Sequence, residues 1–243
     1  MTESPQSAPK ANGLQTVLNT IAAPKEAFEA LREAPTWGWA LLTTLVLIAI
    51  SSFLMVPAIQ HSIDASWAQT VASNPRLAGM SEDKLASAKT FTMMIVGFSP
   101  IFVIVGTFVA MLIQTMIMLI FNAIGRGSGT FKSYWAASWN IAVVAAGIGS
   151  LLLAIIIMLR GVDSFATQTS VQAAMPSLGW LAPHLGKLTN FLGAITIFSV
   201  WAAWLVVMAM SGVGRVSRPL AWITGGVSLL LPSLFALLAP AAQ

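Results

Sequence analysis

The sequence contains no cysteine, only two histidines and few charged residues. Without a thiol, the chain has no disulfide scaffold, no thiolate metal site and no cysteine nucleophile. His61 and His184 alone nearly exclude a metal centre built from several histidines. Charged residues make up 8% of the 243 positions, against about 25% in a typical soluble domain. So few charges cannot cover the surface of a water-soluble protein, which excludes a soluble globular domain.

Apolar residues are abundant instead. They make up 57% of the chain, and the mean hydropathy is +0.82. The net charge of +4 does not indicate a nucleic-acid partner, because basic residues stand singly at the ends of apolar stretches and not in runs or on one face. This placement is typical of the bias of Lys and Arg toward the cytoplasmic side of membrane helices.

Five apolar stretches are long enough to cross a membrane, for which a helix needs roughly 20 residues. None contains Asp, Glu, Lys, Arg or His, and they cover residues 37–59, 91–121, 133–159, 188–210 and 219–238. We therefore predict an all-α, polytopic membrane protein whose five-helix transmembrane domain occupies residues 37–243. Ser99-Pro100 is expected to kink the second span, and Pro232 the last one.

The connections between the predicted spans differ in charge. The two short loops, 122–132 and 211–218, contain no acid and carry the bases Arg126, Lys132, Arg215 and Arg218. The two long loops, 60–90 and 160–187, mix basic and acidic residues. Since Lys and Arg concentrate in short cytoplasmic loops, the pattern predicts a cytoplasmic N-terminus and a C-terminus on the opposite side. The first span lies too far into the chain, and is too long, for a cleaved signal.

The residues before the first span form a separate segment. Residues 1–12 are polar and predict a short disordered tail, whereas residues 13–36 predict amphipathic helix at the membrane surface. Apolar residues recur with helical spacing at Leu14, Val17, Leu18 and Ile21. Trp37 and Trp39 then mark the boundary between water and lipid.

Pro24 suits the start of a second short helix, in which Phe28 and Leu31 share one face. Two interpretations follow for this helix. It stiffens the entry into the first span, or it forms a docking surface for a cytoplasmic partner. In the second case Phe28 and Leu31 would contact the partner, together with the bases of the short loops.

The predicted spans lack the ionisable groups with which ion-coupled transporters, proton pumps and voltage sensors work at membrane depth. A solute route would have to use amides, hydroxyls or backbone. Gln114 and Asn140 are the deepest amides, and Trp201 and Trp204 lie nearer the middle of a span than interfacial tryptophans do. These four side chains either pack and hydrogen-bond between helices, which we favour, or line an apolar path.

Small residues four positions apart let helix backbones approach closely. They form the rows Ala142–Ala146–Ser150, Ala145–Gly149 and Gly106–Ala110. These rows favour packing within the bundle over a seam for self-association, but leave both possible.

The loop from Gly125 to Ser133 resembles a phosphate-binding loop only superficially. Such a loop requires glycine directly before its Lys-Ser pair, and Phe131 stands there instead, which excludes a nucleotide site. The second short loop repeats part of the outline, with Gly214-Arg215 matching Gly125-Arg126. No nucleophile–base pair or metal motif is present, so we expect no enzymatic activity and no cofactor.

Two motifs resemble bacterial members of the Yip family, the Ypt/Rab-interacting membrane proteins. They are the segment IAAPKEAFEALREAPTW at 21–37 and the glycine-rich loop that runs into Thr130-Phe131-Lys132. With the five-span layout, the resemblance covers about residues 14–238. It implies an integral membrane protein with five helices, a cytoplasmic N-terminus and no established catalytic group. Together with the charge pattern, it leads us to expect a protein of the bacterial inner membrane whose C-terminus is periplasmic.

The Rab-binding role of eukaryotic relatives is not carried over. Their Asp-Leu-Tyr-Gly-Pro motif is absent, because Tyr134, the only tyrosine, lies between Ser133 and Trp135. Some bacterial members accompany export ATPases of the ABC type. We therefore expect a scaffold or accessory subunit of another membrane complex, such as an ABC-type exporter, surrounded by lipid. The alternative is a transporter or channel-like protein for a lipid or apolar solute.

Overall fold

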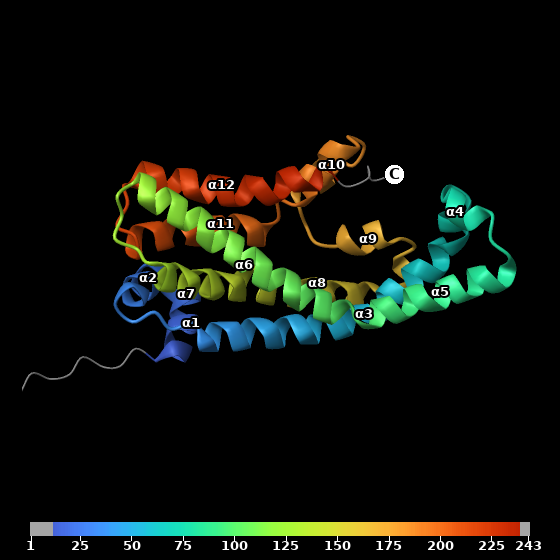
Figure 1. Cartoon of the computed structure of the whole chain (residues 1–243), viewed down its shortest axis with the longest axis horizontal. Coiled ribbons are helices and arrows are strands. Elements are labelled where there is room, and N and C mark those ends of the chain that lie inside the picture. The colour runs from blue at the N-terminus through green and yellow to red at the C-terminus, as the bar shows by residue number, and fades with distance from the viewer. Residues whose placement is uncertain (1–11, 239–243) are drawn as a thin grey trace, which may run out of the picture.

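The structure is a computed structural model that describes residues 12–238. It is an elongated bundle of helices (Figure 1). No strand occurs within this range, where the only β pairing is an isolated bridge between Ser177 and Thr196. The predicted all-α class is therefore confirmed. The predicted disordered tail lies outside the described residues except for Asn12, whose side chain accepts a hydrogen bond from the Leu14 N–H and caps the first helix.

The described helices are, in chain order, α1 Gly13–Ala22, α2 Pro24–Glu33, α3 Gly38–Ser73, α4 Pro75–Ala78, α5 Glu82–Gly97, α6 Ser99–Ile124, α7 Phe131–Ala142, the π-helical turn η1 Val143–Ile148, α8 Gly149–Arg160, the 3₁₀ turn η2 Val162–Ser164, α9 Gln168–Gln172, the 3₁₀ turn η3 Leu178–Leu181, α10 Lys187–Gly193, α11 Ile197–Gly212 and α12 Arg218–Ala236.

Four of the described helical stretches are long and apolar enough to cross a membrane. They are α3, α6, the continuous stretch Phe131–Arg160 formed by α7, η1 and α8, and α12. Each overlaps one of the predicted spans. Pro232 lies inside α12 and does not end it. The 36 residues of α3 correspond to about 54 Å, so this helix is much longer than a hydrocarbon core of about 30 Å requires.

The prediction of one continuous helix over 188–210 is wrong. The chain forms α10, leaves helical structure at Ala194, and starts α11 at Ile197. Thr196 caps α11: its Oγ1 accepts the Ser199 N–H at 3.2 Å, while Ser199 Oγ accepts the Thr196 N–H at 2.8 Å. This reciprocal pair satisfies backbone donors at a helix start and therefore ends the preceding segment. The 16 residues of α11 span about 24 Å.

The prediction of a loop over 60–90 is also wrong. The end of α3, the short α4 and most of α5 form a helical hairpin that extends beyond the rest of the bundle (Figure 1). Lys89 of α5 pairs with Asp64 of α3, with 2.6 Å between Nζ and Oδ1. At the predicted kink, the single residue Phe98 separates α5, which ends at Gly97, from α6, which begins at Ser99 with proline in its first turn.

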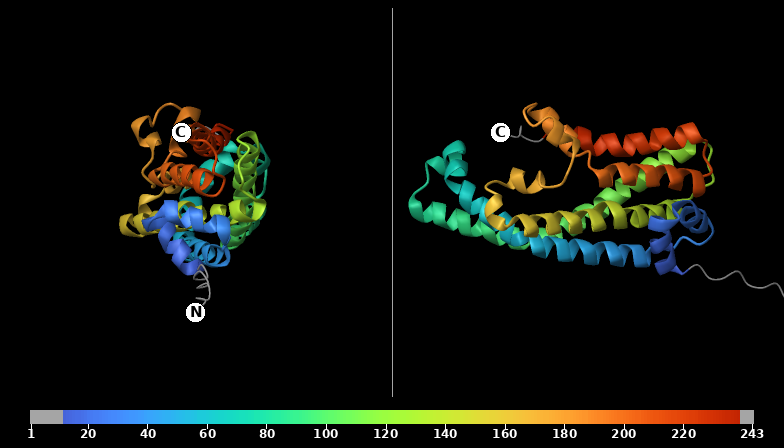
Figure 2. Two further views of the ribbon diagram at one scale, coloured as in Figure 1. Left: turned by 90° about the vertical axis from the view of Figure 1, so that its left-hand side faces the viewer. Right: turned by 180° about the vertical axis from the view of Figure 1, so that it is seen from behind.

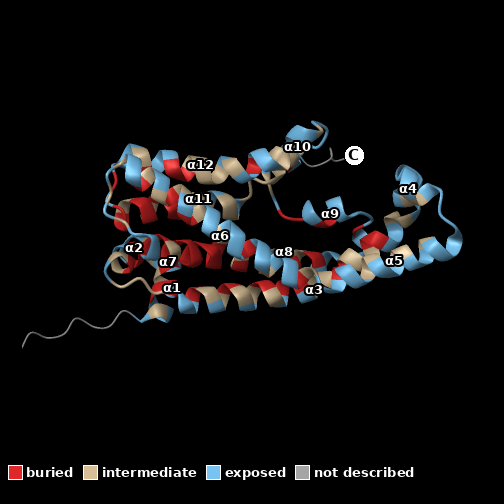
Figure 3. Ribbon diagram, in the orientation of Figure 1, coloured by how far each residue is buried: buried red, intermediate tan, exposed pale blue. Residues whose placement is uncertain are grey.

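The core centres on α7, where residues from Ser133 to Ala142 are buried apart from Trp135 (Figure 3). Small residues allow close packing beside it. A Cβ on Gly147 would lie 2.9 Å from Leu47 Cδ1, and Ser150 Oγ donates to Ser51 Oγ at 3.1 Å. The row Ala142–Ala146–Ser150 therefore belongs to a region that packs against α3. Gly106 and Ala110, by contrast, lie exposed on α6.

Candidate functional site

Both short loops and the first two helices lie at the same end of the bundle, which we call the α2 end (Figures 1 and 2). Residues 125–130 connect α6 to α7, and residues 213–217 connect α11 to α12. The loops contact each other directly, because the Ser128 N–H donates to the Gly214 carbonyl at 2.9 Å. Two helix pairs that are far apart in sequence therefore share one surface at this end.

A buried network holds the first loop in place. The Asn122 side chain donates from Nδ2 to the Gly127 and Gly129 carbonyls, both at 3.2 Å. Its Oδ1 accepts the Gly129 N–H at 3.1 Å and the Tyr134 hydroxyl at 2.9 Å. We call these four residues the Asn122 network. Every polar atom of the Asn122 side chain is satisfied within the chain, so the loop has one defined conformation.

The glycines of these loops permit close packing of backbone. A Cβ on Gly127 would lie 2.7 Å from the Gly214 carbonyl oxygen, and one on Gly214 would collide with the Tyr134 hydroxyl. The glycine-rich outline of residues 125–129 is therefore explained by contact between the two loops. The phosphate cradle excluded from the sequence is therefore replaced by a contact between loops, which no pattern within either loop indicated.

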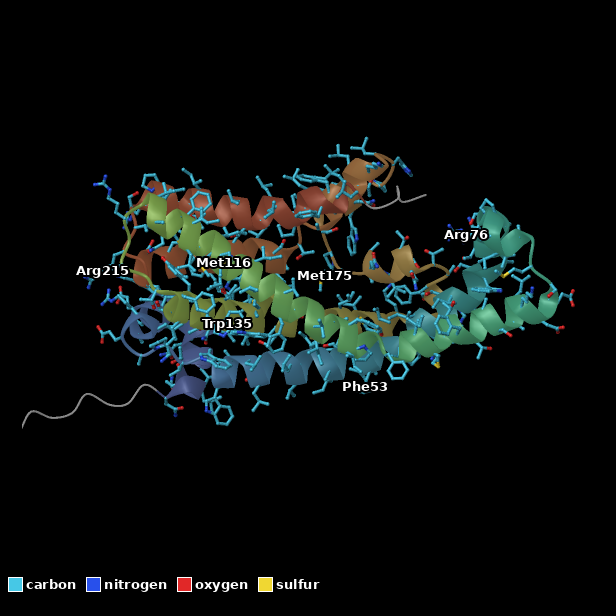
Figure 4. The ribbon with its side chains drawn as sticks, viewed as in Figure 1. Phe53, Arg76, Met116, Trp135, Met175 and Arg215 are labelled. Atoms are coloured by element: carbon cyan, nitrogen blue, oxygen red, sulfur yellow. The ribbon has the colours of Figure 1, made fainter. Side chains whose placement is uncertain are left out.

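The repeated Gly-Arg outline has a structural counterpart. Arg126 and Arg215, each after a glycine at the end of a long helix, have φ values of 50° and 53°, and no other described non-glycine residue has a positive φ. This left-handed conformation commonly ends helices, but it is unfavourable for a residue with a Cβ. Both arginine side chains are exposed, and Figure 4 labels Arg215 at the α2 end of the molecule.

Replacing Arg215 separates the cost of this backbone conformation from the role of the side chain. Arg215→Gly removes the Cβ, whereas Arg215→Ala removes the charge but keeps the Cβ. We expect the glycine variant to be more stable than the alanine variant by about 1 kcal/mol. Thermal unfolding of both variants in the same detergent measures the difference, and equal stability would contradict the left-handed conformation of residue 215.

The structure places the predicted contact residues in two different environments. Phe28 and Leu31 are completely buried inside the chain. A Cβ on Gly212 of α11 would lie 3.0 Å from Phe28 Cβ, so α2 packs closely on α11. These two residues are therefore not available to a partner, and the apolar face of α2 does not face lipid. The predicted basic contacts are all exposed, at Arg126, Lys132, Arg215 and Arg218.

The first helix before the predicted spans, α1, has apolar residues on two faces, one toward the bundle and one away from it. Val17 is buried and packs with Ala40 and Trp139. The outer face of α1 exposes Leu14, Leu18 and Ile21, and Trp37 and Trp39 are exposed nearby in sequence. Within the predicted segment 13–36, helix covers Gly13–Ala22 and Pro24–Glu33. The location of α1 in the headgroup layer stays a prediction, which this exposed apolar stripe supports.

Gln114 forms a hydrogen bond between helices, as we favoured, and Asn140 bonds within α7 and to the segment before α3. Gln114 Nε2 of α6 donates to Ser228 Oγ of α12 at 3.0 Å. Asn140 is fully buried in α7, and its Nδ2 donates to the Ala136 carbonyl at 2.8 Å and to the Thr36 carbonyl at 3.3 Å. Thr36 lies two residues before the start of α3. Asn140 therefore fixes the entry of the first span to the centre of the bundle.

Trp201 and Trp204 line an apolar groove of about 590 Å³ between α11 and α12. The lining of the groove includes Trp201, Ala203, Trp204 and Val207 of α11 and Trp222 and Gly226 of α12. A second hollow of about 340 Å³ shares Ile197 and Val200 with the groove and extends it toward Leu178. Trp222 and Gly226 were not among the predicted lining residues, although their four-residue spacing after Arg218 is visible in the sequence.

The all-helical architecture and the long apolar helices define a membrane protein with several apolar helices. The family model of the Yip1 domain matches residues 18–239, and the chain belongs to this family. The membrane protein YknW of Bacillus subtilis (strain 168) is 23% identical over 210 residues, which cover 86% of this chain and 83% of YknW. No solved structure matches the chain. The resemblance to bacterial Yip proteins is thus confirmed.

Proposed function

We propose that this Yip1-domain protein is a non-enzymatic scaffold or accessory subunit of another membrane complex, such as an ABC-type exporter. Its α2 end would lie in the cytoplasm of a bacterium and its C-terminus on the periplasmic side of the inner membrane. The α11 segment would form the fifth crossing. The concentration of Lys and Arg in the two short loops, which contain no Asp or Glu, supports this orientation.

One observation carries the proposal: two loops from separate helix pairs join into a single exposed surface. Ser128 bonds to Gly214, and the Asn122 network holds the first loop in one conformation. A preorganised surface binds a partner with a smaller loss of conformational entropy than flexible loops would. Its exposed charges include the bases of the short loops and, on α2, the charged side chains Lys25, Glu26, Glu29 and Glu33.

The position of the charged residues argues against ion transport by this chain alone. Asp64 lies 26 residues into α3, and Arg160 lies at the last position of the stretch that begins at Phe131. These positions are about 39 Å and 44 Å along their helices, beyond a hydrocarbon core of about 30 Å if the crossing begins near the α2 end. A supporting role beside another transporter fits this arrangement better than independent ion coupling.

The test is affinity capture of the protein at its native expression level. The variant Lys132→Gln/Arg215→Gln removes two charges from the α2 end, and Arg76→Gln/Lys84→Gln removes two exposed charges from the opposite end. Because surface charges at an interface contribute to association, the wild type and the second variant should recover the same membrane-protein partner, and the first variant should recover about tenfold less. The proposal would be contradicted if the wild type captured no partner, or if both variants recovered the partner in equally reduced amounts.

The groove at Trp201 and Trp204 favours a second candidate, a protein that moves a lipid or apolar solute. However, Gln114 and Asn140 bond elsewhere, so the four residues do not converge on one cavity. The lining of the groove is partly exposed on the outside of the bundle, as Trp204 and Trp222 are 38% and 59% exposed. A binding groove for lipid explains this geometry better than a path through the protein.

A further inference from the structure

The groove between α11 and α12 lies on a helix face with a regular order of residue types. Along α12, Arg218 occupies the first position, Trp222 follows one turn later and Gly226 one turn after that. Residues four apart lie on the same side of a helix, about 6 Å apart along its axis. The face therefore runs from an exposed guanidinium, past an exposed indole, to the apolar groove.

Two adjacent glycines have different roles in this groove. A Cβ on Gly225 would lie 2.8 Å from the Ala203 carbonyl oxygen and 2.7 Å from Val207 Cγ2, so Gly225 allows α12 to approach α11 closely. A Cβ on Gly226 would meet nothing within 4 Å. Gly226 therefore leaves open space in the groove, and a larger side chain there would fill this space without disturbing the packing of the two helices.

The lining indicates which kind of molecule fits. The groove is lined by the side chains of aliphatic residues and tryptophan and by glycine, and its volume of about 590 Å³ is in the range of small-molecule sites. A hydrocarbon chain is the kind of ligand that fits such an apolar lining. A second helix, with a diameter of about 10–12 Å, normally packs against small residues. Here the lining includes the large, partly exposed side chains of Trp204 and Trp222, which favours a thin chain over a helix.

The charge at the end of the face indicates the headgroup. Arg218 is exposed, and Arg215 precedes it in the same loop. No acidic residue lies in the loop 213–217 or in α12. A guanidinium recognises phosphate through paired, charge-assisted hydrogen bonds, and the net positive charge of this acid-free segment favours a headgroup whose net charge is negative. Tryptophan one turn deeper is the residue expected where headgroup and hydrocarbon meet.

We propose that this face binds one anionic phospholipid from the membrane leaflet at the α2 end. The phosphate pairs with Arg218, and one acyl chain passes Trp222 and lies in the groove over Gly226, between α11 and α12. The lipid covers an apolar face that the chain itself leaves open. This inference depends on the groove and on Arg218, not on the proposed partner complex, so the two proposals fail separately.

Native mass spectrometry of the purified full-length protein tests the lipid site. The protein in detergent is mixed with phosphatidylglycerol or, at the same concentration, with zwitterionic phosphatidylcholine of the same chain length. We expect the wild type to retain one phosphatidylglycerol and clearly less phosphatidylcholine. Gly226→Leu should abolish the bound lipid because leucine occupies the groove. Arg218→Gln should reduce the lipid-bound fraction about tenfold and remove the headgroup preference, since a charge-assisted contact is lost.

Two matched variants control for fold and charge. Gly106 of α6 is exposed and also has nothing within 4 Å of an added Cβ, so Gly106→Leu adds the same side chain away from the groove. Lys132→Gln removes an exposed charge at the same end, from a helix that does not line the groove. Both should retain the lipid. Thermal unfolding shows whether Gly226→Leu is folded, and Arg218→Gln provides an independent test if it is not.

Three results would overturn the proposal. The first is equal retention of the anionic and zwitterionic lipids by the wild type. The second is undiminished lipid binding by folded Gly226→Leu or, where that variant does not fold, by Arg218→Gln. The third is a wild type that is dimeric while Gly226→Leu is monomeric, because a second copy of the chain, and not a lipid, would then occupy the groove.

Discussion

Replacing Phe28 with alanine is expected to lower the free energy of unfolding by about 3–5 kcal/mol, the usual cost of truncating a buried aromatic side chain. Phe28 has no exposed surface and belongs to the largest core cluster, together with Tyr134 and Met210. Phe28 packs against Gly212 of α11, where an added Cβ would lie 3.0 Å from Phe28 Cβ. Because glycine has no side chain, nothing at this position of α11 could fill the space that the phenylalanine ring would leave. The resulting cavity and the lost apolar contacts both destabilise the fold.

Thermal unfolding in detergent measures this effect. Because about 1 kcal/mol shifts the Tm of a chain of this size by about 2–4 °C, Phe28→Ala should lower the Tm by about 10 °C. Phe53→Ala is the matched control, because Phe53 is 69% exposed on α3 and its removal leaves no cavity. If both variants had the same Tm as the wild type, α2 would not be packed on the bundle as described.

This result bears on any test of a partner at α2. A polar residue at position 28 or 31 would unfold the α2 end, and loss of a partner would then follow from misfolding. The exposed bases are better positions for such a test, because their side chains do not support the core.

Replacing Asn122 with alanine is expected to lower the free energy of unfolding by about 2–4 kcal/mol. The substitution removes two donated and two accepted hydrogen bonds, including the one from the Tyr134 hydroxyl. Tyr134 is completely buried, so its hydroxyl would lose its partner in a region that water does not reach. Unsatisfied buried polar groups are what make this change costly.

The same variant should also release the loops at the α2 end. Trypsin cleaves after Arg126 and Arg215, and both sites lie in loops that the Asn122 network and the Ser128–Gly214 bond hold in place. Cleavage at these two sites should become faster in Asn122→Ala, whereas cleavage after Arg76 at the opposite end should not change. Asn74→Ala, in an exposed turn before α4, is the control and should leave both loops protected. Unchanged cleavage at Arg126 in Asn122→Ala would refute the role of the network.

Local sequence signals explain most of the helices, including one break that the span prediction missed. The pattern Thr-x-x-Ser caps the start of a helix at Thr130, Thr167 and Thr196, whereas the same pattern at Thr70 lies within the last turn of α3. Apolar length alone joined residues 188–210 into one span, because hydropathy does not register a cap. The hairpin of α3 and α5 was missed for a related reason: its helices continue into polar sequence, where no apolar stripe indicates them.

The candidate sites depended on sequence to different degrees. The unusual depth of Trp201 and Trp204 left two interpretations open, and we favoured packing between helices, whereas both side chains line an apolar groove. The spacing of Phe28 and Leu31 showed that α2 has an apolar face, but an apolar stripe looks the same whether lipid, a partner or the protein itself covers it. Here α11 covers it, with Gly212 providing the space.

By itself, the sequence determined the class of this protein and the approximate positions of four long apolar helices. Composition and the length of an apolar run are local properties, and the free energy of transferring a run into lipid depends on little else. Only the tertiary structure decided which surfaces stay open. The burial of α2, the contact between the two glycine-containing loops and the groove over Gly226 all join residues distant in sequence. Such contacts depend on how well the shapes of two surfaces fit each other, and the residue pattern of a single segment does not reveal the shape of its partner.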